Sequence, residues 1–101
     1  MDILLLGIGL SNNALHQFML KYSIPHDYLA LKEVENYNYK LVVKGPGLSY
    51  DDKVIVEFIN RNIEIITDIE FIYWFLNKEY IAITGTNGKT QYYDTLNYII
   101  K

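Results

Sequence analysis

The sequence has no cysteine, only two prolines and a single tryptophan. Without cysteine the chain can form neither a disulfide framework nor a thiolate metal site, so nothing requires an oxidising compartment and we expect a cytoplasmic protein. The first residues lack the basic leader of a secretory signal, and glycines interrupt the apolar runs far short of a membrane span. We therefore expect a protein that does not engage a membrane. We also expect a monomer.

Positive charge is also scarce, because nine Lys and Arg face twelve Asp and Glu, for a net charge of −3. Nucleic-acid binding rests mainly on many Lys and Arg contacts to phosphates, so this class of partner is disfavoured. Half of the residues are hydrophobic and 21% are charged, a balance typical of globular domains. A chain of 101 residues fits one domain but is short for an enzyme that holds ATP and two further substrates, so we expect part of a larger unit.

Five short apolar runs alternate with segments whose hydrophobic residues recur at helical spacing. The runs, each of strand length, cover residues 3–8, 28–31, 40–44, 63–67 and 80–84. Strands that alternate with helices connect through right-handed crossovers into a parallel sheet covered on both sides. We predict an α/β, Rossmann-like three-layer domain with a five-stranded parallel sheet.

Two of the helical segments carry definite expectations about caps and buried faces. Ser11 or Asn12 is the predicted N-cap of the first helix. Its predicted buried stripe comprises Ala14, Leu15, Phe18, Met19 and Tyr22. In the helix that begins near Asp68, the residues predicted to face the core are Ile69, Ile72, Phe75 and Leu76.

Three glycine-bearing turns follow predicted strands, at Gly7–Ser11, Gly45–Gly47 and Gly85–Gly88. Ligands of parallel sheets collect beyond the carboxyl ends of the strands, so we expect the three turns to share one rim. The first turn resembles an incomplete dinucleotide fingerprint, with Asn12 where a third glycine would stand. NAD is disfavoured because the second strand ends in Leu29-Ala30-Leu31-Lys32, which offers no acid for a ribose.

The first turn taken alone has two interpretations. Its N–H groups at Leu10 and Ser11, with the Ser11 hydroxyl, could hold a diphosphate at the positive end of the following helix. Alternatively, the glycines serve only the close packing of a turn, and the residues leave both interpretations open. His16 and His26 have no acidic or cysteine partner at ligand spacing, so we expect surface or helix-edge positions and no metal site.

The third turn lies in the string Thr84-Gly85-Thr86-Asn87-Gly88-Lys89-Thr90, directly after an apolar strand. Its glycines let backbone N–H groups turn toward an anion, while Lys89 would reach the terminal phosphates of a nucleotide and Thr90 would hold magnesium. A plain glycine turn with one surface lysine is the simpler alternative. The string resembles the ATP loop of the Mur ligases and of their relative folylpolyglutamate synthase.

Two other segments resemble the D-glutamate-adding branch of this family. Gly45-Pro46-Gly47-Leu48 is similar to a Ser-Pro-Gly-Ile turn of that branch. The segment Ile63-Glu64-Ile65-Ile66-Thr67-Asp68-Ile69-Glu70 is similar to another of its motifs, at the right distance before the ATP loop. With these segments the resemblance covers the whole chain.

The resemblance implies a substrate pocket and an ATP site. Gly9, Leu10 and Ser11 would meet the UDP part of UDP-N-acetylmuramoyl-L-alanine, and Gly45, Pro46 and Gly47 would line the same pocket. ATP would bind at Gly85–Thr90, with magnesium on Thr90. The family's reaction is ATP-dependent amide formation in peptidoglycan precursor synthesis: the substrate carboxylate is phosphorylated, and the amine of D-glutamate then displaces the phosphate.

The resemblance also implies a division of the chain. Residues 1–84 would form the UDP-substrate-binding domain, and residues 85–101 would be the ATP loop and first helix of a central ATPase domain that is otherwise missing. The chain alone would then not catalyse. Two alternatives remain: a stand-alone interaction module, derived from a Mur ligase, that docks a partner through its tyrosine-rich last helix, and a free-standing phosphate-loop nucleotide binder.

Overall fold

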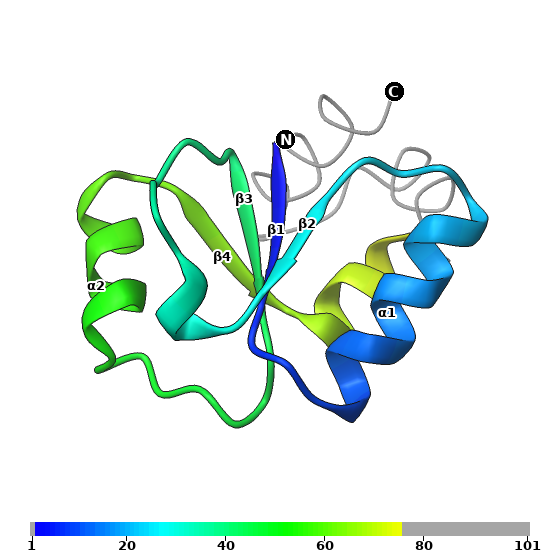
Figure 1. The fold of residues 1–101 in the computed structure, drawn as a ribbon, viewed down its shortest axis with the longest axis horizontal. Helices are drawn as coiled ribbons and strands as arrows, with labels where there is room; N and C mark the ends of the chain where they lie inside the picture. The colour runs from blue at the N-terminus through cyan, green and yellow to red at the C-terminus, as the bar shows by residue number, and fades with distance from the viewer. Residues whose placement is uncertain (1, 76–101) are drawn as a thin grey trace, which may run out of the picture.

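Four parallel strands form the central sheet of the computed structural model, which describes residues 2–75 (Figure 1). The strands are β1 (Ile3–Leu6), β2 (Asp27–Leu29), β3 (Leu41–Lys44) and β4 (Glu64–Thr67), in the order β2-β1-β3-β4. The predicted parallel, Rossmann-like architecture is confirmed. The prediction of five strands is not met within residues 2–75, where the sheet has four, and the fifth predicted strand, at 80–84, lies outside these residues.

The two central strands are buried on both faces, as their continuous apolar sequences require. Side chains alternate between the faces, so Ile3 and Leu5 join one hydrophobic cluster while Leu4 and Leu6 join the other. Helices therefore have to cover both sides of the sheet.

Helices occupy both sides (Figure 1). α1 (Leu10–Lys21) and the helical residues 68–75 pack against one cluster, to which Leu15, Met19 and Trp74 belong. α2 (Lys53–Asn60) covers the other face with Ile55 and Phe58, next to the short 3₁₀ helix η1 (Leu31–Glu33). No helix within residues 2–75 combines the length and hydrophobicity needed to cross a membrane.

The first strand ends earlier, and the first helix begins earlier, than the sequence predicts. Gly7 has φ of 103°, a left-handed conformation that ends β1 and leaves Ile8 59% exposed. The N-cap of α1 is Gly9 rather than Ser11 or Asn12. Of the predicted stripe, Leu15 and Met19 are buried and Phe18 is partly buried, whereas Ala14 and Tyr22 are exposed.

The helix after β4 buries a different face from the predicted one. Thr67 and Glu70 form its capping box, since the Glu70 N–H donates to Thr67 Oγ1 and the Thr67 N–H donates to Glu70 Oε1. Ile69 is 74% exposed and Ile72 is 39% exposed, while the buried residues are Phe71 and Trp74. Aromatic residues on the neighbouring stripe outweigh isoleucines because they remove more apolar surface from water. Phe75 is partly buried, and the predicted Leu76 lies outside the described residues.

Candidate ligand-binding site

A pocket of about 360 Å³ opens between the turns that follow β1 and β3. Its lining comprises Gly7, Ile8, Gly9, Leu10, Ser11, Asn12, Gly45, Pro46, Gly47 and Leu48. All six residues predicted to meet a UDP-sugar, from the first two glycine turns, are among them. The prediction that these two turns share a rim is confirmed, because β1 and β3 are parallel neighbours whose last residues, Leu6 and Lys44, are paired.

The pocket lies at the point where the chain reverses its direction across the sheet. From β1 the chain passes through α1 to β2 on one side, and from β3 it passes through α2 to β4 on the other side. The two connections diverge, so no crossover covers the carboxyl ends of β1 and β3, and a crevice remains between them. Open α/β sheets bind their ligands at such topological switch points.

The positive end of α1 faces this crevice. The first bond within the helix runs from the Asn13 N–H to the Gly9 carbonyl, at 2.8 Å, so the N–H groups of Leu10, Ser11 and Asn12 have no partner within the helix. Gly9 provides no side-chain cap. The three N–H groups and the helix dipole therefore favour an anion at this wall of the pocket.

The four glycines of the pocket fall into two pairs. A side chain at Gly7 would lie 3.1 Å from Leu48 Cδ1, and one at Gly45 would lie 3.4 Å from Asn12 Nδ2. At Gly9 and Gly47, an added Cβ would meet no atom within 4 Å. Each turn thus has one glycine beside packed atoms and one beside open space, so the packing interpretation applies at Gly7, while anion binding stays a prediction.

Asn12 has a structural role that the sequence did not reveal. Its side chain is 1% exposed, and Nδ2 donates to the carbonyl oxygens of Leu6, at 3.0 Å, and Gly7, at 3.1 Å. Among the described residues, its Oδ1 is buried and has no hydrogen-bond partner. Asn12 therefore fastens the first turn to the start of α1 and fills the space beside Gly45.

Lys44 is a second residue that the sequence analysis missed. It closes β3 and is 5% exposed. Its Nζ donates to the carbonyl oxygens of Leu48, at 2.8 Å, and Gly45, at 3.3 Å. In the sequence, the only sign of this role is that a lysine ends an otherwise apolar strand.

The two histidines contact each other rather than standing apart. His16 Nδ1 and His26 Nε2 are 2.7 Å apart, and His26 Nδ1 lies 2.8 Å from the Ile24 carbonyl. The Ile24 carbonyl can only accept, so Nδ1 of His26 donates to it. The ring of Tyr28 packs on His16, and its hydroxyl donates weakly to Gly9 O at 3.4 Å. Within residues 2–75, no three His, Cys, Asp or Glu side chains gather as a metal site would require.

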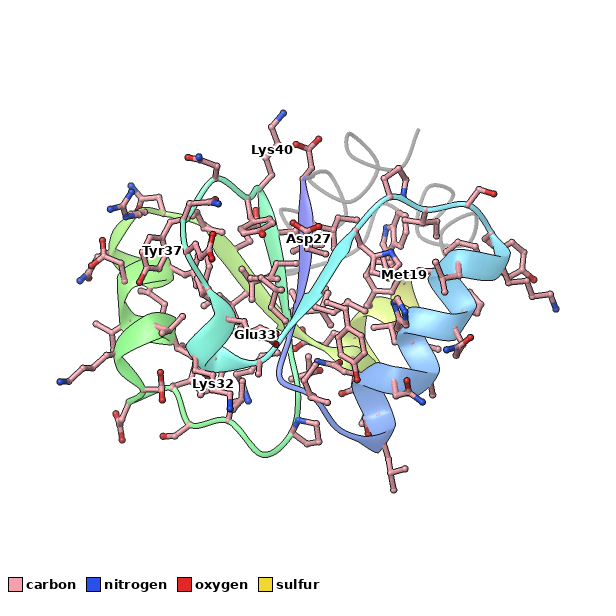
Figure 2. All side chains as sticks on the ribbon, viewed as in Figure 1. Met19, Asp27, Lys32, Glu33, Tyr37 and Lys40 are labelled. Carbon is pink, nitrogen blue, oxygen red and sulfur yellow. The ribbon has the colours of Figure 1, made fainter. Side chains whose placement is uncertain are left out.

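An acidic residue, Glu33, does follow β2, but its carboxylate is hydrogen-bonded to the backbone. Glu33 Oε1 accepts from the Ala30 N–H at 2.7 Å, and the Glu33 N–H donates to the Ala30 carbonyl at 3.0 Å. These bonds form η1, so β2 ends at Leu29 rather than at the predicted Leu31. Figure 2 labels Lys32 and Glu33 on this short helix. The predicted ATP loop, Gly85–Thr90, lies outside the described residues.

The fold and the pocket define a Rossmann-like domain with two glycine turns at its switch point. Comparison with known proteins adds that the chain resembles the N-terminal domain of a Mur ligase, the UDP-N-acetylmuramoylalanine–D-glutamate ligase. It is 38% identical to this ligase from Pediococcus pentosaceus over 66 residues, which cover 65% of the chain and 13% of the ligase. It is 42% identical to the ligase from Oceanobacillus iheyensis over 50 residues, or 50% of the chain and 11% of the ligase.

A third relative, from Staphylococcus aureus strain Newman, is 42% identical over 53 residues, which are 52% of the chain and 12% of that ligase. The matches thus span only between 11% and 13% of the length of these three relatives. No family model matches the chain, and no solved structure matches it.

Proposed function

We propose that this chain is the UDP-N-acetylmuramoyl-L-alanine-binding N-terminal portion of an ATP-dependent D-glutamate-adding ligase in peptidoglycan precursor synthesis. Its relatives bear the name UDP-N-acetylmuramoylalanine–D-glutamate ligase. The observation that carries the proposal is the meeting of two glycine turns at the uncapped N-terminus of α1, in one pocket.

The pocket's walls suit the diphosphate part of such a ligand. The N–H groups of Leu10 and Ser11, with the Ser11 hydroxyl, would hold the phosphates, while Gly45–Gly47 would line the opposite wall. The open space at Gly9 lets the ligand approach the backbone. A volume of about 360 Å³ is at the lower end for small-molecule sites, so the pocket would hold only part of the nucleotide sugar.

The chemistry would need parts beyond the described pocket. Gly85–Thr90 would open the ATP site, with Thr90 as a magnesium ligand, and D-glutamate would bind elsewhere in the full enzyme. The described residues bind and orient the nucleotide end of the acceptor substrate, and no catalytic residue is assigned to this chain.

Calorimetric titration of the chain with UDP-N-acetylmuramoyl-L-alanine, beside plain UDP, tests this function. Gly9→Val should weaken binding because its side chain enters the open space, and Ser11→Ala should weaken it by removing a donor. Asn13→Ala is the matched control, since this exposed residue lies in the same helical turn but does not line the pocket. Absence of binding at millimolar ligand, with the fold intact, would remove the assignment.

A further inference from the structure

Lys44 occupies a position where an apolar residue would satisfy the fold. It ends a central strand, and its side chain leaves the same face as Val42, which belongs to the cluster under α2. Lysine is seldom this deeply buried without a partner for its charge. No carboxylate among residues 2–75 forms an ion pair with it. The contacts of its ammonium group must therefore account for its burial.

All of these contacts lie on the chain that follows β3. Nζ donates to Leu48 O at 2.8 Å and to Gly45 O at 3.3 Å, and it lies 4.8 Å from the centroid of the Tyr50 ring. The three donors of an ammonium are matched by two carbonyls and one aromatic face. The Leu48 N–H closes the turn by donating to Gly45 O at 3.3 Å. Lys44 thus holds both ends of the Gly45–Leu48 turn.

The Gly45–Leu48 turn also supports the opposite wall of the pocket, which the first glycine turn forms. Leu48 packs against Gly7, where an added Cβ would come within 3.1 Å of Leu48 Cδ1. The Gly45 N–H donates to Leu6 O at 3.0 Å. Displacement of Leu48 would therefore alter the separation of the two glycine turns, and Lys44 is the side chain that fixes the Leu48 backbone.

The direction of the two carbonyls bears on the ligand. Gly45 and Leu48 both line the pocket, and a carbonyl oxygen that pointed into it would repel a phosphate. Both oxygens accept hydrogen bonds from the Lys44 ammonium, whose positive charge offsets their negative charge. The negative ends of these two peptide dipoles are therefore kept off the proposed anion site.

We propose that Lys44 is a positioning residue: by binding Gly45 O and Leu48 O it sets the separation of the two glycine turns and keeps both oxygens away from an anionic ligand. The second part rests on the proposed function, because it takes the ligand to be a nucleoside diphosphate. The first part concerns the chain without ligand and has its own test.

Hydrogen–deuterium exchange of the ligand-free chain tests the first part. Lys44→Met keeps the apolar stem and removes the donors, so the hydrogen-bonded amides of Gly45 and Leu48 should exchange about tenfold faster, the change expected when one hydrogen-bonded interaction is lost. Amides of α1 should not change. Lys53→Met is the matched control, because Lys53 is exposed at the start of α2. Unchanged exchange at residues 45–50 would overturn the proposal.

Binding of UDP and of uridine, which lacks the phosphates, tests the second part. Lys44→Met should weaken UDP binding about tenfold and uridine binding by less than about threefold, because the Leu48 carbonyl, which loses its lysine donor, would repel only the charged phosphates. Lys44→Arg, which restores donors, should recover part of the loss. Tyr50→Leu should have a smaller effect than Lys44→Met, since it leaves both hydrogen bonds in place.

The outcomes separate this inference from the proposed function. Equal losses for UDP and uridine would overturn the role toward the anion and leave a purely structural lysine. If the unmodified chain binds neither compound, the proposed function fails, and the role of Lys44 toward the anion fails with it. Faster exchange at residues 45–50 in Lys44→Met would still support the positioning of the turn.

Discussion

The two pairs of glycines in the pocket look alike in sequence but differ in their surroundings. Gly7 packs against Leu48 of the opposite turn and Gly45 packs beside Asn12 of α1, whereas the positions of Gly9 and Gly47 are open. Gly7 allows Leu48 to pack closely against the first turn, Gly45 packs beside Asn12 at an ordinary contact distance, and the second pair leaves open space in the pocket. A glycine-rich turn can therefore serve close packing at one position and leave open space at the next glycine.

Among substitutions that test this difference between the glycines, Gly7→Ala should have the largest effect on stability. Gly7 has φ of 103°, and its Cβ would crowd Leu48 at 3.1 Å, so the free energy of unfolding should fall by about 1–3 kcal/mol. Urea denaturation followed by tryptophan fluorescence measures this, since Trp74 is buried. Gly47→Ala, with no atom near its Cβ, should stay within about 0.5 kcal/mol. Equal losses for the two variants would contradict the division of the glycines.

A smaller loss is expected for Asn12→Ala, which removes the side chain that packs beside Gly45. The variant loses the hydrogen bonds to Leu6 O and Gly7 O, but Leu6 O keeps its bond from the Gly45 N–H. The net cost should be about 1 kcal/mol, measured by the same denaturation. Asn13→Ala, on the exposed side of the helix, is the control. A stabilised Asn12→Ala variant would show that the unpartnered Oδ1 costs more than the two bonds contribute.

The smallest effect at neutral pH lies at the other end of the sheet, where Tyr39 OH donates to Asp27 Oδ2 at 2.7 Å. Burial, aided by the hydrogen bond and the charge of Asp27, raises the pKa of Tyr39 from 10.0 to about 12. The unfolded chain then loses this proton first, so the contribution of Tyr39 to stability should be fully present below pH 10 and should be lost as the pH rises toward 12.

Denaturation midpoints measured across this alkaline range test the expectation, with Tyr39→Phe as the variant. The decline should be shallower in Tyr39→Phe, and ligand binding at neutral pH should be unaltered, because Asp27 begins β2 and Tyr39 precedes β3, at the edge of the sheet away from the pocket. Asp27 is labelled in Figure 2. An equally steep decline in both proteins would assign it to other groups.

Much of the architecture could be predicted from local patterns. The apolar runs at 3–6 and 41–44 could be buried on both faces only in a covered parallel sheet, and that sheet places their following turns on one rim. The open space beside Gly9 and Gly47, by contrast, depends on how far apart the fold places two turns that are distant in the sequence. The hydrophobic periodicity of the sequence does not predict that distance.

The wrong predictions share a physical origin. In the helix from Asp68, hydrophobic residues occur on two adjacent stripes, so spacing alone could not choose Phe71 and Trp74 over Ile69 and Ile72. Asn12 is a good N-cap residue by type, but tertiary contact with Gly45 gives it a buried role instead. The contacts of Lys44 and of the histidine pair, which the sequence left unassigned, depend on partners that only the folded chain brings close.

The placement of α1 and α2 on opposite faces of the sheet has a mechanical consequence. One wall of the pocket continues into α1 and the other leads to α2, so a sliding motion of one helical layer past the other would change the width of the crevice. A molecule that binds both walls would link the two helical layers and restrict this motion. Its binding should therefore slow local opening well away from the atoms it touches.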